Sequence, residues 1–151
     1  MTKIPVIAVV GPTASGKTAL AVAIAQKYNG EVVSADSMQI YKGMDIATAK
    51  PTAEEMKGIV HHLIGFVEPN EKYSVARYIE DASRVIADIH ARNKVPVLCG
   101  GTGLYVDSLL NNIQFEEEPD NREMRTRLQE RLKNEGAQVL LNELMQIDPE
   151  A

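Results

Sequence analysis

Residues 11–18 read Gly11-Pro12-Thr13-Ala14-Ser15-Gly16-Lys17-Thr18, which fits the phosphate-binding pattern G-x-x-x-x-G-K-[ST] at every position. An apolar run over residues 5–10 precedes this loop and an alanine-rich segment over residues 19–25 follows it, so the strand–loop–helix context is present. The glycines let the backbone approach a phosphate, whose oxygens accept hydrogen bonds from loop amides and from the helix N-terminus. Lys17 adds positive charge, and the Thr18 hydroxyl is a ligand for Mg2+. We therefore expect residues 11–18 to bind a di- or triphosphate.

Four apolar runs alternate with helical or irregular segments along the chain. This alternation predicts an α/β fold in which helices flank a parallel sheet, like that of the P-loop NTPases. The stretch over residues 37–58 is mostly irregular, and long loops of this kind often carry function. The predicted strands lie at residues 5–10, 31–35, 60–67 and 95–99, and the predicted helices at residues 19–28, at 75–93 behind a Ser74 N-cap, and at 104–111.

The composition changes near residue 115, where an acidic, proline-containing segment over residues 115–121 reads as a hinge. Two helical stretches divided near Gly136 follow it. We predict an incomplete P-loop core domain over residues 1–114, and over residues 115–151 the hinge and the start of a helical insertion domain that the chain truncates. The first of these helices is locally basic over residues 122–133, which suits either a solvated face or a contact for nucleic acid.

The whole chain of 151 residues has a net charge of −5, which by itself argues against a nucleic-acid partner. The N-terminus lacks the pattern of a secretion signal, and no apolar run has the length of a membrane span. The single Cys99 excludes an intramolecular disulfide and reads as a buried strand thiol. We expect a monomeric, cytoplasmic protein without membrane contact.

Ligands of an open parallel sheet gather at the carboxyl ends of its strands. Asp36-Ser37-Met38-Gln39 follow the second predicted strand, and Asp36 suits a ligand for Mg2+, a proton acceptor or a turn cap. The fourth strand is followed by residues 100–103, Gly-Gly-Thr-Gly, instead of the acid that P-loop NTPases use to hold Mg2+, which argues against ATP or GTP hydrolysis. These glycines suit a second anion-binding helix N-terminus or a simple tight turn.

Other polar residues carry weaker signals. His61 and His62 are adjacent, so in a strand their side chains point to opposite faces and do not meet at one metal ion. Lys42, Lys50 and Arg77 are candidate contacts for phosphate or nucleic acid, although each reads more readily as surface charge.

Three blocks of the sequence resemble those of the tRNA dimethylallyltransferases, in the same order. They are residues 11–18, residues 34–51 (SADSMQIYKGMDIATAKP) and residues 100–105 (GGTGLY), and the resemblance spans about residues 4–112. It implies transfer of a dimethylallyl group from dimethylallyl diphosphate to N6 of adenosine 37, beside the tRNA anticodon, with release of diphosphate. The loop would then hold a leaving group, which explains the missing acid. Members of the family are longer than this chain, so the chain alone would bind diphosphate but modify tRNA poorly.

The same resemblance implies roles for individual residues. Residues 11–18 would hold the diphosphate, with Mg2+ at Thr18, and Lys17 and Thr102 would stabilise the negative charge that grows as the allylic C–O bond breaks. Asp36 would accept the proton of the N6 amine. The implied catalytic residues are Asp36, Thr102 and Lys17, and the implied tRNA-binding residues are Asp36, Ser37, Met38, Gln39, Thr102 and Arg125.

The sequence also allows three other functions. An adenylate isopentenyltransferase would alkylate free AMP, ADP or ATP. A small-molecule P-loop kinase would need an arginine-rich lid, which the sequence after the third predicted strand lacks. A nucleotide-binding regulatory module would keep the loop but need no acid at position 36.

Overall fold

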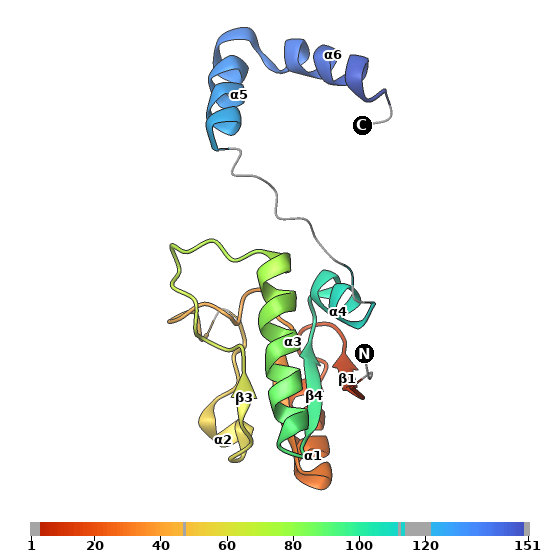
Figure 1. Ribbon diagram of the computed structural model, residues 1–151. Coiled ribbons are helices and arrows are strands. Elements are labelled where there is room, and N and C mark those ends of the chain that lie inside the picture. Colours follow the sequence, from red (N-terminus) through yellow and green to blue (C-terminus); the bar gives the residue numbers. More distant parts are fainter. Residues whose placement is uncertain (1–3, 47, 112, 114–121, 150–151) are drawn as a thin grey trace. The chain divides into compact units, whose positions relative to one another are not determined.

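The computed structural model describes residues 4–46, 48–111, 113 and 122–149 (Figure 1). Its contacts divide the chain into two compact units, Met1–Phe115 and Glu116–Ala151. The predicted hinge over residues 115–121 lies outside the described residues. Within those that are described, no helix is both long and apolar enough to cross a membrane.

The first unit is built on a parallel sheet, as predicted. Its strands are β1 (Ile7–Val10), β2 (Gly30–Ser34), β3 (His61–His62) and β4 (Val95–Gly100), and they lie in the order β1-β4-β2-β3. Every strand pair is parallel, with Val9 of β1 and Ser34 of β2 both in register with Cys99 of β4. All the carboxyl ends therefore meet at one edge of the sheet.

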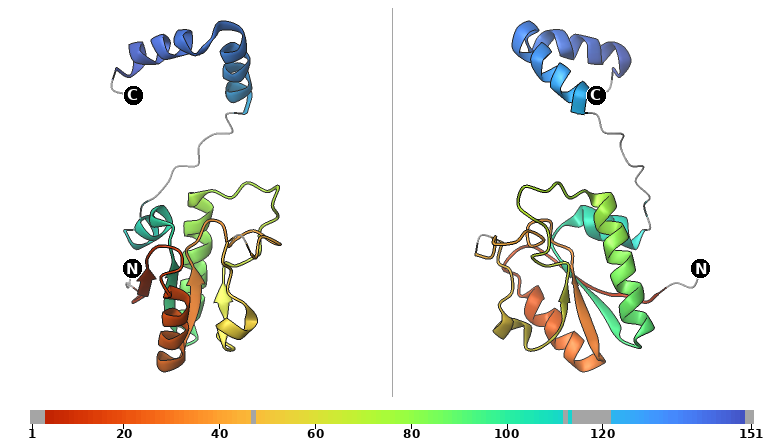
Figure 2. Two further views of the ribbon diagram at one scale, coloured as in Figure 1. Left: turned by 180° about the vertical axis from the view of Figure 1, so that it is seen from behind. Right: turned by 60° about the vertical axis from the view of Figure 1, so that its left-hand side comes forward.

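Helices cover both faces of this sheet (Figure 2). The central strands are buried on both sides, which requires nearly continuous apolar sequence. Val32 and Val97 pack with α1 (Lys17–Tyr28) on one face, and Val33 and Leu98 pack with α3 (Val75–Ala91) and α4 (Gly103–Leu110) on the other. The alternation of these neighbours along each strand follows from the period of two in strand side chains.

The helix ends follow local signals that the sequence carries. Asn29 caps α1 in the left-handed conformation, with φ of 51°, and the Ser74 Oγ accepts a hydrogen bond from the backbone N–H of Arg77 at 3.2 Å to begin α3. The third helix ends at Ala91, two residues earlier than predicted, because Asn93 is left-handed with φ of 57°.

One prediction about residues 37–67 was wrong. The strand predicted over residues 60–67 is reduced to His61–His62, because Leu63 and Gly65 have φ of 59° and 58° and turn the chain out of the sheet. The stretch over residues 37–58 is mostly irregular, as predicted, but it also contains a short helix, α2 (Ala53–Met56), which the Thr52 side chain caps by accepting a hydrogen bond from the Glu55 N–H at 3.2 Å.

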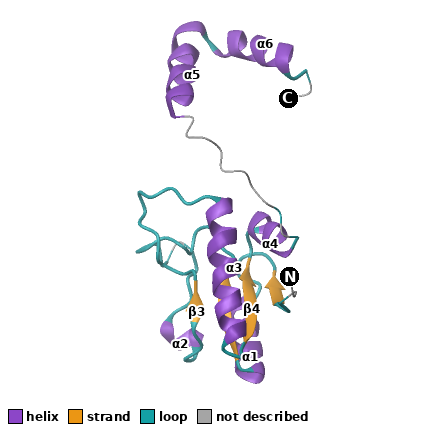
Figure 3. Cartoon of the chain, in the orientation of Figure 1, coloured by secondary structure: helices purple, strands orange, loops and turns teal. Residues whose placement is uncertain are grey.

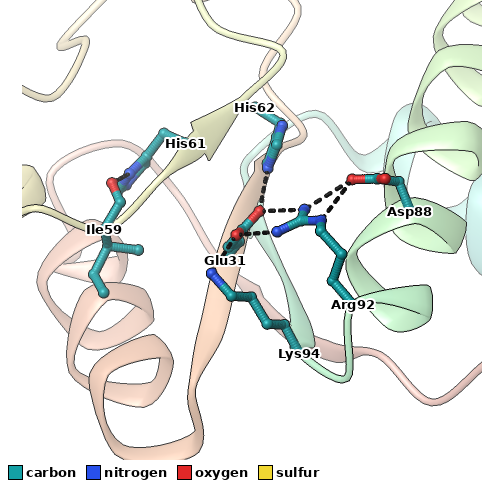
Figure 4. A network of polar contacts seen from close by, with 7 residues as sticks. All are labelled: Glu31, Ile59, His61, His62, Asp88, Arg92 and Lys94. Carbon is teal, nitrogen blue, oxygen red and sulfur yellow. Dashed lines mark hydrogen bonds and ion pairs between the residues drawn. The ribbon is translucent and has the colours of Figure 1, made fainter.

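A buried carboxylate joins the elements at the amino edge of the sheet (Figure 4). The Glu31 side chain on β2 is 3% exposed and forms a double contact with Arg92, at 2.6 and 2.7 Å. Lys94 and His62 each lie 2.7 Å from the same carboxylate. Hydrogen bonds from Arg92, Lys94 and His62 hold the pKa of Glu31 well below its ordinary value.

The second unit is a pair of helices, α5 (Arg122–Glu135) and α6 (Ala137–Ile147), as the sequence predicts. Gly136 separates them with φ of 85°. Arg131 on α5 links the pair, because its guanidinium contacts Glu135 at 2.8 Å and Glu143 of α6 at 2.6 Å.

Candidate active site

The loops that follow β1, β2 and β4 lie at the carboxyl edge of the sheet (Figure 3). The loop predicted to bind phosphate, residues 11–18, contains two left-handed residues, Ala14 with φ of 62° and Gly16 with φ of 80°. The first helix begins directly after it, at Lys17, whose Nζ donates a hydrogen bond to the carbonyl of Pro12 at 2.7 Å. The ammonium group of Lys17 therefore lies against the same loop with which it is predicted to bind phosphate.

A cavity of about 270 Å³ opens beside this loop and brings predicted site residues together. Lys17 and Thr18 share its lining with Asp36 and Gln39, although some twenty residues separate the two pairs in the sequence. Its complete lining is Thr13, Ala14, Ser15, Gly16, Lys17, Thr18, Ala19, Asp36, Gln39, Thr48, Ala49, Glu55, Cys99 and Gly100.

Other predicted residues lie outside this lining. Gly11 and Pro12 line a neighbouring cavity of about 240 Å³ together with Gly100 and Gly101. Ser37, Met38 and Thr102 line neither of these two cavities. Gly100 therefore lines both cavities, and residues of the 11–18 loop also line both.

Close backbone approach explains the glycines after β4. A Cβ on Gly100 would lie 2.2 Å from the carbonyl oxygen of Ala35, and one on Gly101 would lie 3.0 Å from that of Gly11. The carboxyl ends of β1, β2 and β4 consequently pack backbone against backbone at this edge. Both glycines thus permit the approach of the strand ends, and anion binding by this turn stays a prediction.

Asp36 and Thr102 fix the turn that follows β2. Asp36 Oδ1 accepts hydrogen bonds from the N–H groups of Met38, at 2.9 Å, and Gln39, at 3.3 Å. Thr102 Oγ1 accepts one from the Ser37 N–H at 2.9 Å and lies 3.3 Å from Ser37 Oγ. The turn-cap role is therefore present, and among the described residues none donates a hydrogen bond to Asp36 Oδ2.

Thr102 occupies the N-cap position of α4, but its side chain caps no helix amide. Its hydroxyl faces Ser37 instead and ties the turn after β2 to the end of β4. The bond from Thr102 to a diphosphate stays a prediction.

The remaining predicted tRNA contacts differ in their surroundings. The Gln39 Nε2 donates to the carbonyls of Thr48 and Ala49, each at 3.2 Å, so this amide holds a loop within the chain itself. Met38 is 47% exposed. Arg125 lies on α5 in the second unit, so its tRNA contact stays a prediction.

The three basic residues singled out from the sequence divide into two kinds. Lys42 pairs with Glu68 at 2.5 Å and Arg77 pairs with Glu71, and all four side chains are largely exposed. The Lys50 side chain is only 9% exposed, which contradicts the surface-charge interpretation for this residue. Its burial follows from two partners, the carbonyl of Tyr41 at 2.8 Å and the carboxylate of Asp45 at 2.6 Å.

Sequence reasoning missed several lining residues of the cavity. Thr48, Ala49 and Glu55 belong to segments predicted as irregular. The spacing of Thr52 and Glu55 forms a capping box, and this signal could have placed Glu55 on a helix start near the site. Cys99 is buried as predicted, and burial raises the pKa of its thiol.

The donor set of the cavity suits a hard cation held jointly with a phosphate. Thr18, Asp36 and Glu55 line the cavity and carry oxygen atoms, the ligand type that Mg2+ prefers. In the described part of the chain, no three His, Cys, Asp or Glu side chains gather closely enough to hold a metal ion by themselves. His61 and His62 form no metal pair, since one ring lies 2.9 Å from the Ile59 carbonyl and the other contacts Glu31 (Figure 4).

Comparison with known proteins adds to this geometry. A tRNA dimethylallyltransferase of Caldanaerobacter subterraneus subsp. tengcongensis is 51% identical over 148 residues, which is 98% of this chain and 47% of that protein. The structure of a full-length tRNA isopentenylpyrophosphate transferase from Bacillus halodurans is 45% identical, with a TM-score of 0.75 over 98% of this chain and 49% of that one. A eukaryotic dimethylallyltransferase acting on tRNA is 36% identical, with a TM-score of 0.72 over 96% of this chain and 36% of that one.

The chain spans about half the length of the curated relatives that it matches. A family model described as isopentenyl transferase matches residues 4–65, and one described as IPP transferase matches residues 39–151. The second match covers most of the chain, including Gln39 and Thr48 of the cavity as well as both helices of the second unit. This chain belongs to the IPP transferase family.

Proposed function

We propose that this chain is the donor-binding part of an enzyme that transfers a dimethylallyl group from dimethylallyl diphosphate to N6 of adenosine 37 in tRNA, with release of diphosphate. The observation that carries this proposal is the cavity that unites Lys17 and Thr18 of the phosphate-binding loop with Asp36. The names of the relatives support it, and they do not favour a small-molecule kinase.

The loop of residues 11–18 stabilises the departing diphosphate. As the allylic C–O bond breaks, its electron pair goes to the diphosphate oxygen, and preorganised loop amides together with the Lys17 ammonium compensate the growing negative charge. A bound Mg2+ near Thr18 would neutralise further charge on the phosphate oxygens. Lys17 already lies over the loop through its bond to Pro12, so it exchanges one oxygen acceptor for another when the diphosphate binds.

Asp36 accepts the proton of the acceptor amine. The lone pair of an adenine N6 is delocalised into the ring, so removal of a proton as the new C–N bond forms makes the nitrogen a better nucleophile. The two N–H groups that bond Oδ1 hold the carboxylate in one orientation, which leaves Oδ2 for the proton. Thr102 keeps the turn in place through Ser37.

The acceptor base reaches this edge from a single-stranded loop. Adenosine 37 lies in the anticodon loop, where a base leaves its stack at lower cost than in a duplex. Met38, which is exposed two residues after Asp36, would contact such a base. Basic residues of α5, including Arg125, would contact the phosphate backbone and make binding sensitive to salt.

A transfer assay tests this proposal. Because the chain alone is expected to modify tRNA slowly, tRNA is incubated with an excess of the chain, dimethylallyl diphosphate and Mg2+, and nucleoside mass spectrometry then measures dimethylallyl addition at adenosine 37. AMP replaces tRNA in a parallel reaction, because an adenylate isopentenyltransferase would modify AMP. Calorimetric titration with the donor, in wild type and Lys17→Ala, tests the donor-binding part alone. Equal donor binding by the two proteins, or modification of AMP instead of tRNA, would contradict the proposal.

A further inference from the structure

The Lys50 side chain, which is 9% exposed, closes a loop beside the cavity. This loop, here called the 41–50 loop, runs from Tyr41 to Lys50, and the Lys50 Nζ returns to the carbonyl of Tyr41 at 2.8 Å. The same Nζ pairs with Asp45 Oδ1, halfway along the loop, at 2.6 Å. One side chain thus joins the two ends of the loop and its middle.

The 41–50 loop supplies part of the cavity wall. Thr48 and Ala49 line the cavity together with Lys17 and Asp36. Ala49 has φ of 48°, which a residue with a side chain holds only where its surroundings impose it. The Gln39 amide, bonded to the carbonyls of Thr48 and Ala49, holds the same two residues from the sheet side.

We propose that Lys50 is a positioning residue of the transfer reaction, because its ammonium closes the 41–50 loop and thereby fixes the Thr48–Ala49 wall of the diphosphate cavity. This inference rests on the proposed function. Lys50 does not line the cavity, so it acts through the backbone that it holds. A charge that is buried with oxygen partners is costly to leave unpaired, so the closed arrangement is favoured whenever the loop is ordered.

Substitution of Lys50 tests the proposal against a matched control on the same loop. Lys50→Met removes both contacts and keeps the aliphatic stem, and Lys42→Met removes an equal charge from a side chain that is 50% exposed, against 9% for Lys50. We expect Lys50→Met to weaken binding of dimethylallyl diphosphate in the presence of Mg2+ by about tenfold, and Lys42→Met by less than about twofold. Calorimetry measures the Kd, and thermal denaturation verifies that each variant is folded.

A second pair of variants keeps Lys50 in place. A Cβ on Gly65, where φ is +58°, would lie 3.2 Å from the Lys50 Nζ, and among the described residues beyond its chain neighbours the Lys50 side chain alone lies within 4 Å. Gly58 has φ of +77°, and a Cβ there meets no described residue beyond its chain neighbours within 4 Å, so Gly58→Ala imposes a similar backbone cost without touching Lys50. We expect Gly65→Ala to weaken donor binding and Gly58→Ala to leave it unchanged. This pair decides the question if Lys50→Met fails to fold.

Hydrogen exchange separates a failure of this inference from a failure of the proposed function. Peptides that cover the 41–50 loop should exchange at least about tenfold faster in Lys50→Met than in Lys42→Met, whether or not the donor binds. If wild type fails to bind the donor, the proposed function is wrong and the exchange rates still decide the role of Lys50 in the loop. Equal Kd values for the two lysine variants, or equal exchange rates, would overturn the inference.

Discussion

At the scale of single residues, the side chains of the candidate site also make hydrogen bonds that hold the fold together. Asp36 Oδ1 accepts two backbone hydrogen bonds, and Thr102 holds Ser37 in the same turn. Such bonds fix a reacting group before the substrate arrives, which reduces the reorganisation that the reaction requires. The structural role and the proposed chemical role of Asp36 therefore belong to different oxygens of one carboxylate.

Asp36→Asn separates these two roles. The amide oxygen of asparagine can still accept the hydrogen bonds of Met38 and Gln39, whereas the side chain no longer accepts a proton. We expect the single-turnover rate of transfer to tRNA to fall by about a hundredfold or more, with the Kd for dimethylallyl diphosphate nearly unchanged. Wild-type transfer rates in this variant would exclude Asp36 as the proton acceptor.

Gly100→Ala tests the close packing of the strand ends. The new Cβ would lie 2.2 Å from the carbonyl of Ala35, so the strands must separate. We expect the free energy of unfolding to fall by about 3 kcal/mol, as urea denaturation measures. Gly103→Ala is the matched control, since a Cβ there meets nothing within 4 Å, and we expect it to be neutral. Equal stabilities of these two variants would refute the packing account.

At the scale of elements, the two edges of the sheet are stabilised by different contacts. The amino edge is held by the ion pairs of Glu31, which connect β2 with Arg92, at the end of α3, and with Lys94 and His62. The carboxyl edge is held by backbone approach at Gly100 and by the turn after β2. The ion pairs of Glu31 therefore lie at the edge of the sheet opposite the proposed phosphate site.

Glu31 makes the stability of the first unit depend on pH. Because its pKa is lowered in the folded state, its contribution is fully present above the ordinary glutamate value of 4.5 and is lost as the pH falls below it. We expect Glu31→Gln to cost about 3 kcal/mol at pH 7, and the difference from wild type to shrink below pH 4.5. Urea denaturation across this pH range measures both effects.

Asp88→Asn controls for the charge change. Asp88 pairs with the same Arg92 at 2.8 Å, but its side chain is 62% exposed. We expect this variant to lose no more than about 0.5 kcal/mol. A pH-independent difference between wild type and Glu31→Gln would contradict the linkage to Glu31.

At the scale of the whole molecule, sequence periodicity and motifs predicted the parallel sheet and most helices, because these depend on local patterns. The patterns failed where long-range contacts decide. The strand over residues 60–67 ends at His62, since Leu63 and Gly65 adopt left-handed backbone, and the Gly65 N–H donates a hydrogen bond to the carbonyl of Gln39 at 2.9 Å. The burial of Lys50 could not be predicted either, because its partners Tyr41 and Asp45 become neighbours only when the loop closes.

The candidate site also combines residues set by local patterns with residues set by long-range contacts. The glycine and lysine pattern of residues 11–18 specifies a phosphate-binding loop by itself, and parallel strands bring Asp36 to the same edge. Thr48 and Ala49 carry no such signal, since tertiary contacts, including the bonds from Gln39 to their carbonyls, hold them at the cavity. The meeting of Lys17, Thr18 and Asp36 at one cavity was therefore more predictable than the other residues of its lining.

A crystal structure of the chain with Mg2+ and a non-hydrolysable analogue of dimethylallyl diphosphate tests the central claim most directly. The account predicts the diphosphate on residues 11–18, within hydrogen-bond distance of Lys17, and the allylic carbon on the side of the cavity that Asp36 lines. A diphosphate bound elsewhere, or an allylic carbon turned away from Asp36, would contradict it.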